Sequence, residues 1–335
     1  MDWLGLDIGG ANLKVADGGQ FARTRPFALW RQPQQLAAEL QRLLQEAPAC
    51  RQLAVTMTGE LADCYASKAE GVVAIVEAAV RAAPSRQVAI YSHEGRFLSA
   101  DQAVGQPDLV AAANWHALAT FAARHVAADG LLIDVGSTTM DVVRLVEGRP
   151  APAGRTDTQR LLAGELIYSG VGRTPLAMLV EVLPWRGAEC PVARESFATT
   201  LDVYLMRGEL AEESTNTDTA DGRPATRAAA QARLARMICA DPAEVTEADA
   251  LGFADAVAAR QRAALEQAVR RVAGRARGGP QQMVVSGQGE FLARQAAAQA
   301  FPQAGLVSLA DRAGAAISLC AAAHAVAVLA EEQDG

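Results

Sequence analysis

Lysine is nearly missing from this sequence: among its 31 basic residues, only Lys14 and Lys68 are lysines and the others are arginine. Arginine replaces lysine well at many surface positions, but the two differ where a compact point charge is needed. Both remaining lysines lie in or beside the motifs described below. We therefore expect them to act in the functional site.

Other features are scarce too, and each scarcity narrows the class of protein. The five cysteines are far apart without C-x-x-C spacing, and none of the four histidines pairs with another at metal-ligand spacing. A zinc site or a disulfide framework is therefore not expected. No uncharged apolar run reaches the roughly 18 residues of a membrane span, and no secretory signal begins the chain. We expect a cytoplasmic protein without a membrane partner.

The net charge is negative and apolar residues are abundant. A net charge of −7 argues against a nucleic-acid partner. Hydrophobic residues make up 50% and charged residues 21% of the 335 residues, which is enough for a full core in two domains or one large domain. We expect small-molecule partners, and a homodimer is compatible with the sequence.

One short pattern occurs twice, in residues 7–14 and again in residues 134–141. Each copy follows an apolar run typical of a strand, makes an Asp-x-Gly turn at Asp7 or Asp134, and leads into another strand. Glycine lets backbone N–H groups approach phosphate oxygens, and an aspartate at a strand end can hold Mg²⁺. An ordinary hairpin turn explains either copy alone. Two copies together favour a clamp for a polyphosphate and its metal.

The rest of the chain alternates helical and strand patterns, which predicts an α/β fold with helices packed on mixed sheets. A three-stranded meander is expected in residues 1–28, and the hairpin pattern restarts in residues 131–148 as a duplication of architecture. We expect a closing helix over 311–329 with Asp311 as its N-cap. The other expected helices are 33–46, 66–82, 114–126 and 247–276, and the other expected strands are 53–57, 87–92, 282–285 and 305–309.

A third glycine-rich segment begins at Ser286 and contains Gly287, Gln288 and Gly289 between an expected strand and an expected helix. Such a loop allows close approach of a flat or phosphorylated ligand at the helix N-terminus. A plain strand-to-helix turn is an equally good explanation.

The order of the Asp7 hairpin, the Asp134 hairpin and the Ser286 loop resembles the phosphate-1, phosphate-2 and adenosine motifs of the acetate and sugar kinase/Hsp70/actin superfamily. This resemblance implies two RNase-H-like domains with a central cleft. The first would be residues 1–127, completed by a C-terminal helix at 311–330. The second would be residues 128–310, with a helical insertion at about 161–245.

Longer segments resemble one family within this superfamily, the hydantoinase/oxoprolinase-like proteins of the tetrahydromethanopterin-linked C1 transfer pathway. Archaeal relatives in that family build the furan–phenol ether of methanofuran. The resemblance implies displacement of diphosphate from an aminomethylfuranmethyl diphosphate by a phenol of the glutamyl-tyramine or tyrosine type. The segments that carry it are 56–64, 68, 70–72, 114–115, 134–139, 156–157, 160–161, 164–168, 170, 173–175, 195–200, 220–224 and 233–237.

With that chemistry, the candidate residues fall into groups. We assign Asp7 and Asp134 to Mg²⁺, with Asp141 as a second metal ligand or a surface residue, and Glu60 or Asp63 as the carboxylate that takes the phenol proton. Helix N-capping is the alternative for those two acids. The expected diphosphate-binding residues are Gly9, Gly10, Asn12, Lys14, Gly136, Ser137, Thr138 and Thr139, with the charge of Lys68 added and Arg155, Arg160 or Arg173 as a further grip.

The sequence context leaves the roles of four further residues open or ordinary. Tyr168 stacks on an aromatic substrate or packs in the core, and Glu165 binds the substrate amine or closes a helix. The default interpretation makes Asn114 an N-cap and Trp115 a core residue.

Two other functions stay open at this point. One is an ATP-dependent kinase or an oxoprolinase-like hydrolase, and the other is a non-catalytic nucleotide-binding protein of C1 metabolism. The segment from Ser286 to Glu290 lacks the Gly-Gly doublet usual in ATP-binding members of the superfamily, which argues against ATP as a cofactor.

Overall fold

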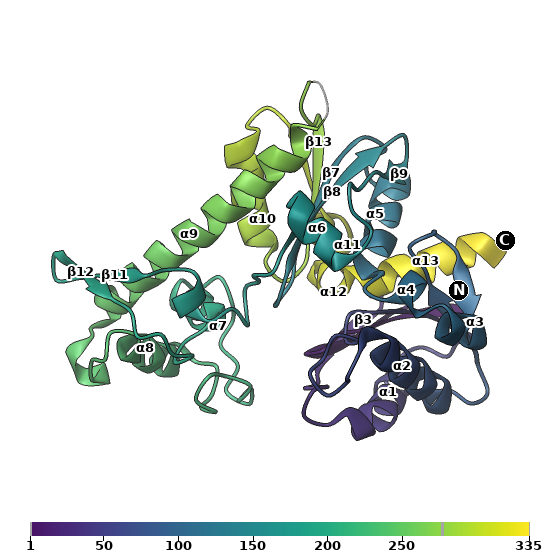
Figure 1. Cartoon of the computed structure of the whole chain (residues 1–335), viewed down its shortest axis with the longest axis horizontal. Helices are drawn as coiled ribbons and strands as arrows, with labels where there is room; N and C mark the ends of the chain where they lie inside the picture. Colours follow the sequence, from purple (N-terminus) through teal and green to yellow (C-terminus); the bar gives the residue numbers. More distant parts are fainter. Residues whose placement is uncertain (1, 276–277, 335) are drawn as a thin grey trace.

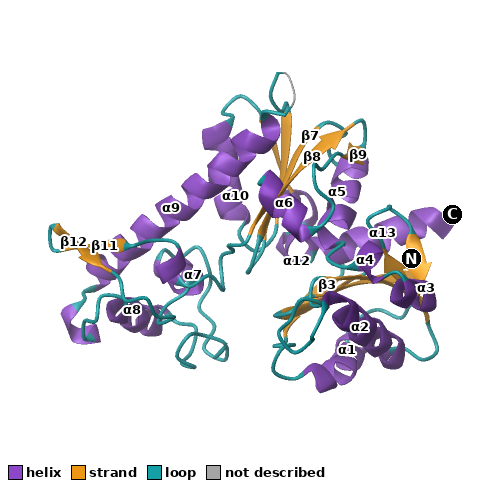
Figure 2. Cartoon of the chain, viewed as in Figure 1, coloured by secondary structure: helices purple, strands orange, loops and turns teal. Residues whose placement is uncertain are grey.

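The computed structural model describes residues 2–275 and 278–334. Two β-sheets form the centres of two lobes, and a third, mostly helical part extends away from the second lobe (Figure 1). Figure 2 shows helices covering the faces of both sheets. No helix among the described residues is long and apolar enough to cross a membrane.

The first sheet has the strand order β3-β2-β1-β4-β5-β6. Its central strand β1 is buried along its whole length, as its apolar sequence predicts, and pairs antiparallel with β2 and parallel with β4. The strands are β1 (Trp3–Ile8), β2 (Asn12–Ala16), β3 (Ala22–Pro26), β4 (Gln52–Met57), β5 (Gln87–Tyr91) and β6 (Phe97–Ser99). The helices of this part are α1 (Leu36–Gln45), α2 (Lys68–Ala82), α3 (Ala100–Gly105), α4 (Pro107–Val110) and α5 (Asn114–His125).

The second sheet repeats this topology in the order β10-β8-β7-β13-β14, with the short β9 also paired to β8. Its first strand β7 is antiparallel to β8 and parallel to β13, just as β1 is to β2 and β4. The two sheets therefore confirm the predicted α/β fold with two RNase-H-like units. The elements are β7 (Gly130–Val135), β8 (Met140–Val146), β9 (Arg149–Pro150), α6 (Asp157–Ala163), β10 (Leu166–Ile167), β13 (Gln282–Ser286), α10 (Glu290–Ala300) and β14 (Gly305–Ser308).

The extension lies between β10 and β13 in the sequence. The long helix α9 (Glu247–Ala273) leads from the second lobe to a group formed by α7 (Thr200–Met206), α8 (Arg227–Arg236) and the hairpin of β11 (Val182–Trp185) and β12 (Ala188–Pro191) (Figure 1). A buried ion pair fixes α8 to α7, since Arg233 Nε donates to Asp202 Oδ1 at 2.7 Å. None of these elements changes the sheet order around the cleft.

The C-terminal segment differs from the single helix expected over 311–329. It forms three helices, α11 (Leu309–Ala313), α12 (Ala315–Leu319) and α13 (Ala321–Asp334), and Gly314 has a φ of 101° at the first break. The N-cap of α11 is Ser308, whose hydroxyl accepts from Asp311 N, so Asp311 is not the cap. The last helix packs on β1 so closely that a Cβ at Gly5 would lie 1.9 Å from Ala323 O.

Candidate functional site

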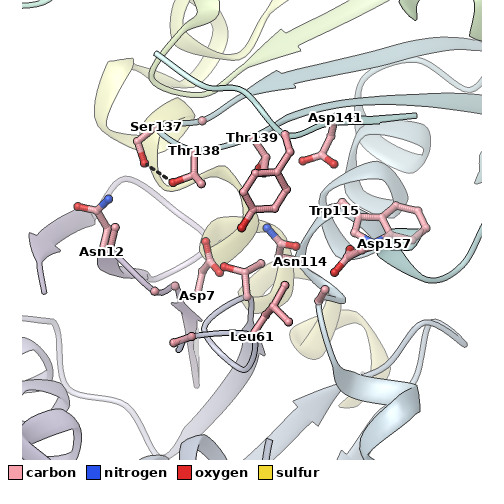
Figure 3. Close-up of a pocket in the computed structure, with 18 of the residues that line it drawn as sticks. Asp7, Asn12, Leu61, Asn114, Trp115, Ser137, Thr138, Thr139, Asp141 and Asp157 are labelled. Carbon is pink, nitrogen blue, oxygen red and sulfur yellow. Dashed lines mark hydrogen bonds between the residues drawn. The ribbon is translucent and has the colours of Figure 1, made fainter. Parts of the chain in front are cut away.

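A cavity of about 350 Å³ lies between the two lobes. Figure 3 shows Asp7 and Leu61 from the first lobe facing Thr138, Thr139 and Asp141 from the second. The turn between β1 and β2, the loop after β4, the start of α5, the turn between β7 and β8, and α6 all contribute to its wall. The two hairpin turns predicted from the sequence therefore border one cavity.

The two turns have the same backbone hydrogen bond. Gly9 N donates to Asn12 O at 3.0 Å, and Gly136 N donates to Thr139 O at 2.9 Å. The second turn has no space behind it, because a Cβ at Gly170 would lie 2.4 Å from Thr138 N. The first turn has open space on its cavity side, because a Cβ at Gly10 would meet no atom within 4 Å. The predicted diphosphate residues Gly9, Gly10, Asn12, Lys14, Gly136, Ser137, Thr138 and Thr139 all line the cavity.

Asp7 and Asp134 are on opposite sides of this cavity, and Lys14 lies close to both. Lys14 Nζ is 3.8 Å from Asp7 Oδ2, whereas Asp134 Oδ1 accepts from Ser286 Oγ at 2.5 Å. Burial raises the pKa of Asp134 to about 6, since Ser286 and Lys14 only partly offset it. Burial alone would lower the pKa of Lys14, but the charges of Asp7 and Asp134 raise it. Lys14 therefore stays an ammonium between two acids.

One carboxylate oxygen at this end has no partner in the part of the chain that the structure describes. Asp7 Oδ1 is buried and makes no hydrogen bond there, and burial raises the pKa of Asp7. A cation at Asp7 would satisfy that oxygen. No group of three or more His, Cys, Asp or Glu side chains that could hold a metal occurs in residues 2–275 and 278–334. Two carboxylates suit Mg²⁺, which usually binds one or two protein acids together with water and phosphate oxygens.

At the other end, Glu60 is the most buried acid of the cavity, with 1% of its surface exposed. Burial raises its pKa to about 7; Asp157 adds to the increase and Lys68 opposes it. Among residues 2–275 and 278–334, none is a hydrogen-bond partner of Glu60 Oε2. The backbone of Glu60 is fixed by α2, because a Cβ at Gly71 would lie 2.2 Å from Glu60 O.

The loop after β4 also carries Asp63, which lines the cavity but is exposed. The alternative that Glu60 or Asp63 caps the following helix is wrong: the N-cap of α2 is Ser67, whose hydroxyl accepts from Glu70 N. Lys68 does not line the cavity. Its ammonium lies 3.0 Å from Asp157 on α6, away from the two glycine turns.

Four neighbouring side chains complete this end of the cavity. Arg160 NH2 donates to Asp141 Oδ1 at 2.7 Å, and the Arg160 guanidinium lies 4.0 Å from the centre of the Trp115 ring. Asp141 is therefore neither a free metal ligand nor a surface residue, and Arg160 is not free to grip diphosphate. Asn114 is the first residue of α5, with Ala113 as N-cap, and its side chain points toward the middle of the cavity (Figure 3).

Comparison with known proteins shows the family. Residues 51–333 match the sequence profile of the hydantoinase/oxoprolinase family. The chain belongs to this family. It is 31% identical over 333 residues to (4-{4-[2-(gamma-L-glutamylamino)ethyl]phenoxymethyl}furan-2-yl)methanamine synthase of Methanocaldococcus jannaschii, covering 98% of each chain. It is 27% identical over 217 residues to the synthase of the same name from Methanococcus vannielii, covering 64% of this chain and 96% of that one.

A solved structure supports the fold alone. Nucleotide-free acetone carboxylase matches with a TM-score of 0.56 and 10% identity, over 97% of this chain and 70% of that chain. At this identity the likeness concerns only the arrangement of the sheets and helices.

In this hydantoinase/oxoprolinase family member, two of the residues expected to bind substrate or diphosphate lie at the cavity wall and one does not. Tyr168 is 60% exposed and lines the cavity, so the core-packing alternative is wrong. Arg173 also lines it, with its guanidinium 4.2 Å from the centre of the Trp30 ring of the other lobe. Glu165 is fully buried outside the cavity: it accepts from Ala153 N at 2.7 Å and pairs with Arg275. We therefore remove Glu165 from the site.

The loop of Ser286, Gly287, Gln288 and Gly289 does not line the cavity either. A Cβ at Gly287 would lie 2.4 Å from Val135 O, and one at Gly289 would lie 2.4 Å from Val135 Cγ1. These glycines permit close packing of the loop on β7, and Ser286 holds Asp134. The prediction that this loop binds a ligand directly has no support in the geometry.

Proposed function

We propose that this chain is a synthase of methanofuran-type cofactor biosynthesis that joins an aminomethylfuranmethyl diphosphate to a phenolic acceptor. The phenol oxygen would form a bond to the furan methylene carbon, and the bond from that carbon to the diphosphate oxygen would break. The relative from Methanocaldococcus jannaschii, similar over 98% of both chains, is named for a product with such a phenoxymethyl–furan link.

The observation that carries the proposal is the chemical difference between the two ends of one cavity. The glycine turns, Lys14, the buried Asp7 and the half-buried Asp134 suit a diphosphate that is bound with Mg²⁺. The opposite end offers Glu60, a buried carboxyl with a pKa raised to about 7. A leaving group at one end and a proton acceptor at the other is what displacement by a phenol requires.

At the first end, Asp7 and Asp134 would hold Mg²⁺, which supplies positive charge to stabilise the departing diphosphate. The hydroxyls of Ser137 and Thr138, which lie 3.4 Å from one another, would donate to its oxygens. Lys14 would neutralise part of its charge without leaving Asp7.

At the second end, Glu60 is a better candidate than Asp63 for the base. A general base works best with a pKa near the working pH, and burial raises the pKa of Glu60 to about 7. Asp63 is exposed at the edge of the cavity. The unpartnered Glu60 Oε2 would accept the phenol proton.

ATP-dependent kinase or hydrolase activity is the weaker candidate. The loop expected to bind adenosine is packed on β7 and contributes nothing to the cavity wall. A non-catalytic nucleotide-binding protein would also need that loop to contact the nucleotide.

The test is turnover of the purified chain with an aminomethylfuranmethyl diphosphate, a tyramine or tyrosine derivative, and Mg²⁺. The proposal predicts equal amounts of diphosphate and ether product, measured by a diphosphate assay and mass spectrometry. Diphosphate release must depend on the phenol, and ATP must not be consumed. ADP formation, or hydrolysis of the furan substrate at the same rate without phenol, would contradict it.

A further inference from the structure

The N-terminus of α5 opens into the end of the cavity that contains Glu60. Ala112, Asn114 and Trp115 all line the cavity, and the N-cap residue Ala113 has no side chain that could bond the first turn. Within the described residues, the backbone N–H groups of Asn114, Trp115 and His116 donate to no other residue. The twelve-residue helix therefore presents free donors and the positive end of its dipole.

An independent observation points to a ligand at the same place. Trp115 is 3% exposed and lines the cavity, yet its indole Nε1 donates to nothing within the described chain. Glu60, which lines the same cavity, has an unpartnered buried acceptor in Oε2. Leaving a buried donor or acceptor without a hydrogen bond is unfavourable. A group that accepts from Trp115 and donates to Glu60 would satisfy both.

Most of the other charged groups of this region are paired or uncharged. Arg160 is paired with Asp141 and Lys68 with Asp157, although Arg160 Nε has no partner among the described residues. Burial lowers the pKa of His93, and it lowers the pKa of His116 to about 3, so both imidazoles are neutral at pH 7; the exposed Arg155 lowers both pKa values further. Asp63 is exposed at the loop after β4. The start of α5 therefore adds a positive feature beside the Glu60 carboxyl to the charge of Lys68, which is already paired with Asp157.

We propose that the N-terminus of α5, together with the indole N–H of Trp115, binds the oxygen of the phenolic acceptor as it ionises. This inference rests on the proposed function and adds the acceptor subsite to it. A phenol fits both requirements, because its O–H donates to Glu60 while its oxygen lone pairs accept from the indole and the helix.

The subsite lowers the cost of proton transfer. In the reaction, the phenol O–H bond breaks and its proton moves to the Glu60 carboxylate. The phenolate oxygen forms the bond to the furan methylene carbon, and the departing diphosphate keeps the electron pair of the bond that breaks. A free phenol has a pKa of about 10, well above that of Glu60. Donors aimed at the phenolate oxygen reduce this difference.

The direct test uses 4-nitrophenol, whose ionised form absorbs visible light, as a probe of the wild-type protein. Titrated by absorbance in the presence of Mg²⁺ and inorganic diphosphate, the bound probe should ionise at least one pH unit below the free probe. Trp115→Phe should lose most of this lowering of the probe's pKa. The variant keeps an aromatic ring against Arg160 but removes the indole N–H donor. Trp185→Phe, in the hairpin of β11 and β12, is the matched control and should behave as wild type.

A kinetic measurement adds a second, separate readout. With phenols of decreasing pKa as acceptors, Trp115→Phe should reduce kcat about 100-fold for the least acidic phenol and progressively less for the more acidic ones. A shift of 4-nitrophenol without any ether formation would support the subsite and contradict the proposed function. Ether formation with a bound probe that ionises at or above its free pKa, or with no probe binding, would overturn the subsite alone.

Discussion

The ammonium of Lys68 and the carboxylate of Asp157 lie 3.0 Å apart and join the two lobes beside the cavity. Lys68 is the first residue of α2 in one lobe, and Asp157 is the first residue of α6 in the other. Both act on Glu60, with opposite effects on its pKa. The pair therefore joins the two lobes and also influences the proton acceptor.

Removing Lys68 and removing Asp157 should shift the pH profile of the reaction in opposite directions. Lys68→Met leaves Asp157 unpaired, which raises the pKa of Glu60 and moves the acid limb of kcat/KM to higher pH. Asp157→Asn leaves the Lys68 charge and moves that limb to lower pH. The pair is partly exposed, so each variant should lose at most about 1 kcal/mol of stability. Shifts in the same direction would show that the pair acts only through the fold.

The wild-type reaction should itself depend on Glu60 ionisation. Because Glu60 must be unprotonated to accept a proton, kcat/KM should rise with pH through about 7. Glu60→Gln should reduce kcat by roughly 10²- to 10⁴-fold above pH 7 and progressively less below it, where wild-type Glu60 is itself protonated, so the variant loses the acid limb. Asp63→Asn should retain much of the activity. A pH–rate profile of the three proteins checks this; an unchanged acid limb in Glu60→Gln would remove Glu60 as the base.

Stability should change with pH in the opposite sense to activity. The folded-state pKa of Glu60 is about 7, above the ordinary 4.5, so the folded chain holds this proton more tightly than the unfolded chain does. The corresponding stability is present below pH 4.5 and is lost as pH rises through about 7. Glu60→Gln has no such loss. Urea unfolding at pH 5 and pH 8 should show the variant gaining relative to wild type only at the higher pH.

Two glycine-to-alanine changes should separate binding from folding. At Gly10 a Cβ meets no atom and would extend into the cavity, so Gly10→Ala should keep the wild-type Tm and raise KM for the diphosphate substrate. At Gly170 a Cβ would lie 2.4 Å from the backbone of the second turn, so Gly170→Ala should lower Tm. Thermal unfolding with steady-state kinetics measures both. Wild-type KM in Gly10→Ala would place diphosphate elsewhere.

Much of the architecture follows from the sequence because local patterns there agree with the tertiary fold. The apolar run of β1 and the Asp-x-Gly turn after it determine a buried strand and a hairpin, and the same holds for β7. The C-terminal segment was harder to predict, since its alanine-rich sequence has a continuous helical pattern that indicates one helix. The break at Gly314, where φ is 101°, divides it.

The site was only partly predictable for a different reason. Asp7 and Asp134 are marked by their turns. Asn114 and Trp115 belong to a segment that resembles the family, but their local sequence is that of an ordinary helix start, and their place beside the cavity came from the structure. Glu165 is next to Leu166 of the cavity wall, yet its side chain bonds the backbone at Ala153. Two neighbouring residues can point their side chains into the cavity and away from it. In irregular segments the sequence spacing does not show which of the two faces the cavity.

The central claim, that two turns from opposite lobes hold one diphosphate through Mg²⁺, is tested most directly by calorimetric titration of inorganic diphosphate. The account predicts binding to the wild-type chain that requires Mg²⁺ and is lost in both Asp7→Asn and Asp134→Asn, while both variants unfold cooperatively as the wild type does. Diphosphate binding that is equally tight without Mg²⁺, or unchanged in either variant, would contradict it.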